Sequence, residues 1–80
     1  MKRIQDIANK IEHYLRTDCS DEWHVKVKEN TIIAYYTSIK KFEITYDEDF
    51  EDWYIDGKYL QIGMIGEIFT IIKQYEERGF

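Results

Sequence analysis

Apolar residues at the start of the chain recur with the period of a helix. They recur at positions i, i+3, i+4, i+7 and i+11, and most positions between them are charged or polar. The stripe consists of Ile4, Ile7, Ala8, Ile11 and Leu15. This spacing places all five side chains on one side of an amphipathic helix. The sequence therefore predicts a helix over residues 1–16, ended by the small polar residues of 17–22.

The pattern then changes to strict alternation, which is typical of half-buried strands. The alternating apolar positions are Trp23, Val25 and Val27, and later Phe42, Ile44 and Tyr46. Between them, residues 31–38 are rich in the β-branched and aromatic side chains that favour strands. Glu29 and Asn30 suit a two-residue hairpin turn, since Asn tolerates a positive φ. The pattern predicts three consecutive strands in a meander.

Two further features complete the predicted elements. Asp56-Gly57 is a strong signal for a type I′ hairpin, so short strands are predicted near 53–55 and 58–62. The last stretch again has apolar residues at helical spacing, and Gly79 is placed to cap that helix. Its apolar positions are Ile65, Ile68, Phe69, Ile72 and Tyr75.

The order of these elements indicates the fold class. A chain of 80 residues forms one domain, here a single compact domain over residues 1–80. An antiparallel sheet needs a cover on one face, and the two terminal helices have apolar stripes to provide it. We therefore predict an α+β fold of order α-β-β-β-β-β-α. It is a small two-layer domain with both helices on one face of about five short strands.

Charge limits the possible partners. The chain has 16 acidic and 11 basic residues, a net charge of −5. Seven of the acidic residues lie within 43–56, a stretch without Lys or Arg. Such a surface repels phosphate backbones, and the sequence offers no cluster of basic residues to attract them. Direct binding of nucleic acid is therefore not expected.

The sequence also indicates a compartment. Cys19 is the one cysteine, so no intramolecular disulfide forms, which fits the reducing cytoplasm. The longest apolar run covers residues 32–36, far less than a membrane span requires. We expect a soluble cytoplasmic protein with no membrane partner.

No metal motif is complete. In an EF-hand loop counted from Asp47, the sixth position needs Gly and the twelfth needs Glu, but this chain has Asp52 and Lys58 there. His13, Cys19 and His24 lack the spacing of a zinc site, and structural zinc takes four ligands. We expect no bound metal and no other cofactor.

No catalytic motif is present either. Neighbouring carboxylates on a solvated loop all stay ionised. None of them has the raised pKa that a general acid needs beside an ionised base. The segment GMIGE at 63–67 lacks the third Gly and the Lys of phosphate-binding loops. Cys19 with a distant His is the one pair of nucleophile and base that could be suggested. We expect no enzymatic activity.

A binding surface is the remaining candidate. The helices cover one face of the sheet, while adjacent residues of a strand point to opposite faces. One ring of Tyr35 and Tyr36, and one of Trp53 and Tyr54, should therefore lie on the uncovered side. Carboxylates beside such aromatic side chains suit docking on a basic surface. The candidate partner-binding residues are Tyr35, Tyr36, Asp47, Glu48, Asp49, Glu51, Asp52, Trp53, Tyr54 and Asp56.

Three interpretations of this acidic, aromatic segment stay open. The first is an inhibitor or regulator, monomeric or dimeric, that docks on a basic protein partner such as a nuclease or another nucleic-acid-binding protein. In size, charge and compactness the chain is similar to phage-encoded anti-CRISPR and anti-restriction inhibitors and to nuclease immunity proteins. The second is a housekeeping adaptor or homodimer that uses an open aromatic sheet face. The third is a solvated turn that keeps the protein soluble and discourages pairing of sheet edges.

Overall fold

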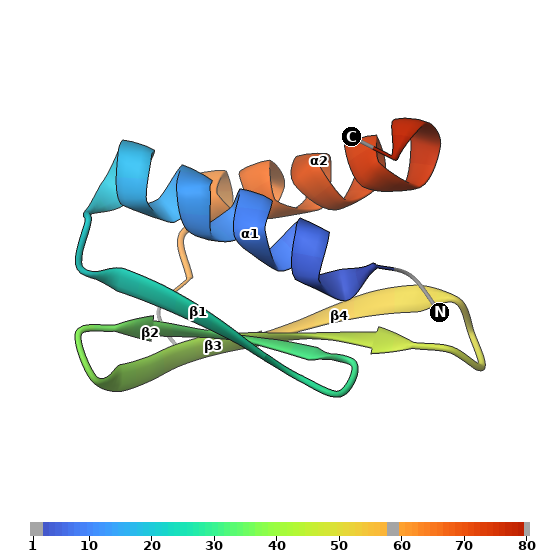
Figure 1. Cartoon of the computed structure of the whole chain (residues 1–80), viewed down its shortest axis with the longest axis horizontal. Helices are drawn as coiled ribbons and strands as arrows, with labels where there is room; N and C mark the ends of the chain where they lie inside the picture. The colour runs from blue at the N-terminus through green and yellow to red at the C-terminus, as the bar shows by residue number, and fades with distance from the viewer. Residues whose placement is uncertain (1–2, 58–59, 80) are drawn as a thin grey trace.

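Two helices cover one face of a four-stranded antiparallel sheet (Figure 1). The computed structural model describes residues 3–57 and 60–79. The predicted α+β class, with an N-terminal and a C-terminal helix on the same face, is confirmed. The elements are α1 (Ile4–Tyr14), the π-helical turn η1 (Leu15–Cys19), β1 (Trp23–Lys28), β2 (Thr31–Tyr36), β3 (Ile39–Asp47), β4 (Asp52–Gly57) and α2 (Ile62–Arg78).

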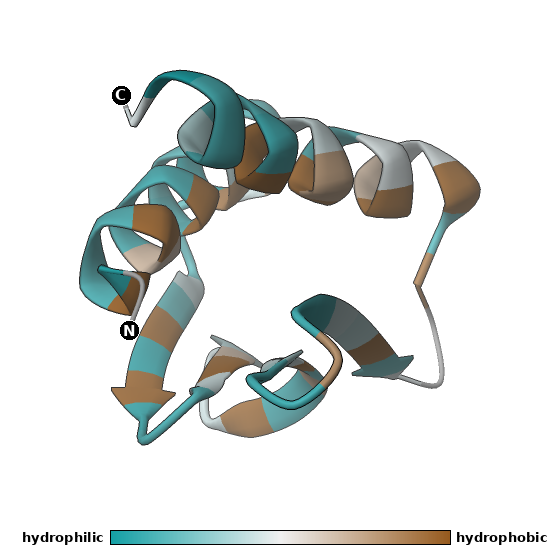
Figure 2. Cartoon of the chain, turned by 90° about the vertical axis from the view of Figure 1, so that its right-hand side faces the viewer, coloured by the Kyte–Doolittle hydropathy of each residue, from teal (hydrophilic) through white to brown (hydrophobic). Residues whose placement is uncertain are grey.

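The sheet is a meander in which every strand pairs with its neighbour in sequence. Alternate residues face the helices, and pairs such as Ile32 opposite Ile44 and Ala34 opposite Phe42 form the buried layer. The other side of the sheet, here called the open face, has no helix over it (Figure 1). Figure 2 shows the resulting alternation of hydrophobic and hydrophilic positions along the strands.

Helix α1 buries the residues expected from its sequence, but α2 buries its stripe only in part, since Ile65 and Tyr75 are half-buried and Phe69 is 39% exposed. In α1 these residues are Ile4, Ile7, Ala8 and Ile11, and Leu15 follows in η1. In α2, Ile68 and Ile72 are buried against the same core. Gly79 ends α2 in the left-handed region at φ 71°, and its N–H donates to the carbonyl of Tyr75 at 2.7 Å. This is the predicted glycine cap.

The predicted hairpin at Asp56-Gly57 is wrong. Both residues belong to β4, and neither has the positive φ that a type I′ turn requires. Gly57 lies opposite Phe42, and a Cβ at Gly57 would be only 2.5 Å from the Cβ of Phe42. The glycine therefore allows two strands to approach closely. Of the predicted fifth strand, residues 58–59 lie outside the described chain, residues 60–61 are irregular, and α2 begins at Ile62.

One hydrogen bond joins α1 to the first edge strand. The backbone N–H of Val25 donates to the Glu12 carboxylate at 2.8 Å. An edge strand otherwise presents such donors to other chains. Glu12 therefore fixes β1 under α1 and occupies one of its outward-facing donors.

Each of the three hairpin turns contains a residue with left-handed backbone, and in the β3–β4 turn it is Glu51, with φ 51°. The predicted turn at Glu29 and Asn30 is present, but the positive φ of 57° is at Glu29 rather than at Asn30. Thr37, in the β2–β3 turn, has φ 59°. A β-branched residue is especially disfavoured there, because its side chain crowds the backbone. Thr37 is therefore a strained position.

Replacing Thr37 with Gly should raise the free energy of unfolding by about 0.5–1 kcal/mol, because relief of the left-handed strain exceeds the entropy cost of glycine. Urea denaturation measures the change. Ser38→Gly is the matched control in the same turn, where φ is not positive. It should give no gain, and an equal gain from both variants would contradict the assignment of strain to Thr37.

Candidate functional site

The connection between β3 and β4 is a turn held by its own acidic side chain. One carboxylate oxygen of Asp47 accepts hydrogen bonds from the backbone N–H groups of Asp49, at 2.9 Å, and Phe50, at 3.3 Å. Asp52, which begins β4, accepts a bond from the N–H of Trp53 at 2.9 Å. Two of the predicted partner-binding carboxylates thus also shape the turn. The segment Asp47–Asp52 is called the acidic turn below.

A second hairpin brings further polar groups to the same place. The side-chain amide of Asn30, between β1 and β2, donates to Glu48 at 3.3 Å, and the carbonyl of Asn30 accepts from the N–H of Tyr46 at 2.9 Å. The neighbouring Glu29 is exposed. We call the combined surface the acidic end. It consists of Glu29, Asp47, Glu48, Asp49, Phe50, Glu51 and Asp52.

The acidic end carries six carboxylates, and Lys28 precedes Glu29 in the same hairpin. Within residues 3–57 and 60–79, the ion pairs join Arg3 to Asp6, Lys40 to Glu43 and Lys73 to Glu77. None of them includes a carboxylate of the acidic end. Because all of these carboxylates lie at one end of the sheet, their fields add rather than cancel.

The aromatic side chains divide between the two faces of the sheet. Tyr54 lies on the open face and is 51% exposed, whereas the adjacent Trp53 is 7% exposed beneath the helices and packs on Tyr46 at 5.0 Å. Likewise Tyr35 lies on the open face, while Tyr36 packs on Trp23 at 5.4 Å. Trp53 and Tyr36 are therefore core residues and are removed from the candidate surface.

Two other candidate residues lie away from the acidic end. Tyr35 is two strands from β4, and the Lys26 amine lies 5.7 Å from the centre of its ring. Asp56 is exposed on β4 opposite Glu43, at the far end of that strand from the acidic turn. The structure thus gathers five of the predicted carboxylates, leaves Tyr54 beside them and separates Tyr35 and Asp56.

Two surface residues were missing from the predicted set. Phe50 is 77% exposed within the acidic turn, and Glu29 is exposed on the other hairpin, next to the Asn30 that bonds Glu48. A large apolar residue between carboxylates, with no apolar neighbour two positions away, was the available signal for Phe50. No local signal existed for Glu29, because its proximity depends on strand pairing.

Neither a family model, nor a curated protein, nor a solved structure matches this chain. Of the helices in residues 3–57 and 60–79, none combines the length and apolar character needed to cross a membrane. Over the same residues, no group of three His, Cys, Asp or Glu side chains is arranged to hold a metal ion. The geometry and charge of the surface are therefore the available evidence on function.

Proposed function

We propose that this chain is a small, non-enzymatic binding protein that docks its acidic end on a basic surface of a protein partner. A site that binds nucleic acid has the required positive charge, so the chain would act as an inhibitor or regulator by occupying it. The carboxylates would speed the encounter, and Phe50 with Tyr54 would supply the buried contact.

The exposure of Phe50 carries this proposal. Carboxylates in a turn are explained by solubility alone, but solubility does not explain a phenylalanine held 77% exposed among them. Burying such a side chain contributes about 1.5–3 kcal/mol, and in this protein that contribution is unused. A partner that covers Phe50 would gain it.

The open face of the sheet is a weaker candidate for the contact. Its polar groups already interact with one another, as in the 3.1 Å bond between the hydroxyls of Thr31 and Thr45 and the 3.1 Å ion pair of Lys40 and Glu43. A partner on that face would have to replace these contacts. At the acidic end the corresponding contact is the 3.3 Å bond of Asn30 and Glu48, while Asp49, Phe50 and Glu51 are exposed. This favours the acidic end over an adaptor or homodimer built on the open face.

Removing charge from the acidic end should slow association with the partner. In the variant Glu48→Gln, Asp49→Asn, Glu51→Gln, the turn-forming Asp47 is kept, and we expect at least a tenfold lower association rate at low salt with a shallower salt dependence. Phe50→Ala should instead speed dissociation, by about 30-fold if the ring is an anchor worth 2 kcal/mol. Surface plasmon resonance with a partner captured from cells of the source organism measures both rates.

A control with the same change in net charge separates local from global effects. The variant Asp21→Asn, Glu22→Gln, Glu67→Gln also removes three exposed carboxylates, none of which lies at the acidic end. In 0.15 M salt it should leave association within about twofold of the parent, since charges more than about 8 Å from the contact are largely screened there. The proposal is wrong if the two charge variants associate equally fast, or if the acidic-end variant matches the parent at low salt.

A further inference from the structure

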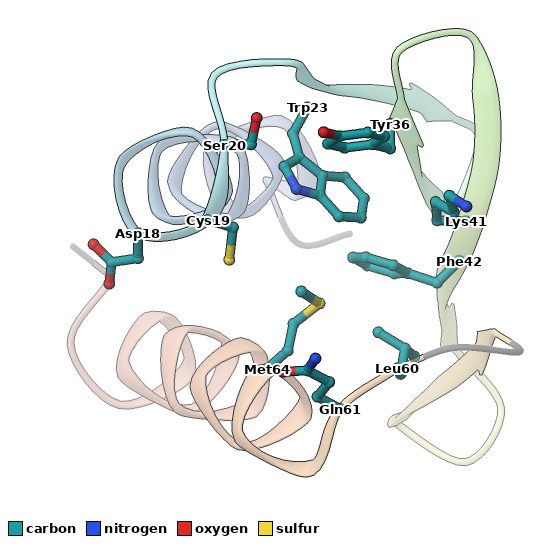
Figure 3. Close-up of a pocket in the computed structure, with 10 residues that line it drawn as sticks. All are labelled: Asp18, Cys19, Ser20, Trp23, Tyr36, Lys41, Phe42, Leu60, Gln61 and Met64. Atoms are coloured by element: carbon teal, nitrogen blue, oxygen red, sulfur yellow. The ribbon is translucent and has the colours of Figure 1, made fainter.

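A cavity of about 560 Å³ opens where the helical layer separates from the sheet. It lies between η1, the start of β1, the turn region of β2 and β3, and the beginning of α2 (Figure 3). The acidic turn is at the opposite end of the sheet (Figure 1). Nothing in the proposed docking mode uses this cavity.

One wall of the cavity is aromatic. Trp23 packs on Tyr36 edge to face, with ring centres 5.4 Å apart, and on Phe42 at 5.8 Å. These rings are fixed by the core, because Trp23 and Phe42 are buried and lie on β1 and β3, the two strands that flank β2 with Tyr36. The wall therefore presents a preformed aromatic surface.

The facing wall is aliphatic and contains sulfur. Leu60 and Met64 precede and begin α2, and the Cys19 thiol points from η1 towards the same space (Figure 3). Thioethers and thiols make favourable contacts with aromatic rings at about 5 Å. A flat ring between the two walls would meet aromatic side chains on one side and sulfur atoms on the other.

Two irregularities in the backbone form this opening. The π-helical turn η1 widens the end of α1 and carries Cys19 to the rim, and such turns are frequent at functional sites. In the β2–β3 pairing Lys41 is the extra residue, since Ala34 lies opposite Phe42 while Tyr35 lies opposite Lys40. A bulge of this kind redirects a side chain, and Lys41 lines the cavity.

Tyr14, at the end of α1, lies close to Cys19 at the rim of the cavity. Burial raises the pKa of the Tyr14 phenol, and the nearby Cys19 raises it further. The Cys19 side chain thus lies beside α1, and it is exposed at the rim of the cavity. Its position at the cavity is a defined feature of the fold.

We propose that this cavity binds a small, planar aromatic molecule without net charge. Its volume lies within the range of about 300–1,000 Å³ typical of small-molecule sites. Apolar side chains form its two walls, and uncharged Ser20 and Gln61 also line it. The two charged residues of the lining, Asp18 and Lys41, have opposite signs and lie on opposite sides of the opening (Figure 3). An uncharged ring system fits this surface better than an ion of either sign.

The probe for this site is N-phenyl-1-naphthylamine, a neutral aromatic dye that fluoresces in apolar surroundings. We expect saturable binding to the parent protein with one dye per chain. Met64→Glu introduces a charge into the wall and should weaken binding at least tenfold. Ile62→Glu is the matched control, because Ile62 is 89% exposed in the same helical turn but does not line the cavity. It should bind as the parent does.

A second measurement requires no variant of the wall. Cys19 is the one cysteine of the chain, so its alkylation by iodoacetamide reports on the cavity directly. Saturating dye should slow this reaction at least fivefold. The proposal is overturned if binding does not saturate, if Ile62→Glu loses binding as Met64→Glu does, or if bound dye leaves the alkylation rate unchanged. None of these outcomes bears on the acidic end.

Discussion

Replacing Ile11 with Ala is expected to lower the free energy of unfolding by about 2–5 kcal/mol, the cost of a cavity in a packed core. Ile11 is fully buried on α1, where its side chain belongs to the core shared by both helices and the sheet. The same loss is expected for Ile68→Ala on α2, since Ile68 is equally buried. Urea denaturation followed by circular dichroism gives both values.

The size of this effect follows from the size of the protein. At about 0.05–0.15 kcal/mol per residue, a domain of this length has roughly 4–12 kcal/mol of stability, so one truncation removes a large fraction. Ile62→Ala, at an exposed position of α2, should change stability by about 0.5 kcal/mol or less. If Ile11→Ala or Ile68→Ala behaved like this control, the corresponding helix would not be packed on the sheet as described.

Replacing Gly57 with Ala should cost about 1–3 kcal/mol through overpacking. The added Cβ would lie 2.5 Å from the Cβ of Phe42 and 2.9 Å from the carbonyl oxygen of Lys41. Neither atom is at the free end of a flexible side chain, so β3 and β4 have to move apart. Thermal unfolding of the variant measures the loss.

The same substitution at Gly66 is expected to have the opposite effect on stability. Gly66 lies within α2, and apart from its chain neighbours and the backbone of its own helix nothing lies within 4 Å of the Cβ that Ala would add. The substitution should therefore stabilise the protein by about 0.5–1 kcal/mol. A loss at Gly57 with a gain at Gly66 supports close strand approach as the reason for Gly57. Tolerance of Ala at position 57 would show that β3 and β4 are farther apart than described.

The sequence alone determined the elements and their class. Helical spacing of the apolar residues located the buried side of α1, including Ile7 and Leu15. Alternation located β1 and β3, and a run of β-branched and aromatic residues located β2. Gly79 marked the end of α2. These signals are local, because the period of a helix or a strand is set by backbone geometry within a few residues.

The sequence determined only part of the candidate site. It located the acidic turn, since six carboxylates between 47 and 56 are visible without any structure. It showed that one ring of each adjacent aromatic pair faces away from the helices, but not which one. That choice depends on the register of β4, which places Trp53 opposite Tyr46 under the helical layer and Tyr54 opposite Thr45 on the open face.

Tertiary structure decided the remaining features because each depends on contacts between distant segments. Gly57 was mistaken for a turn residue, since its neighbour Phe42 is fifteen positions away in the chain. Glu29 joins the acidic end only through the pairing of β1, β2 and β3. The aromatic cavity likewise exists only where α2 returns to the start of β1. Alternation shows that a strand has two faces, and the packing of the whole chain decides what covers each of them.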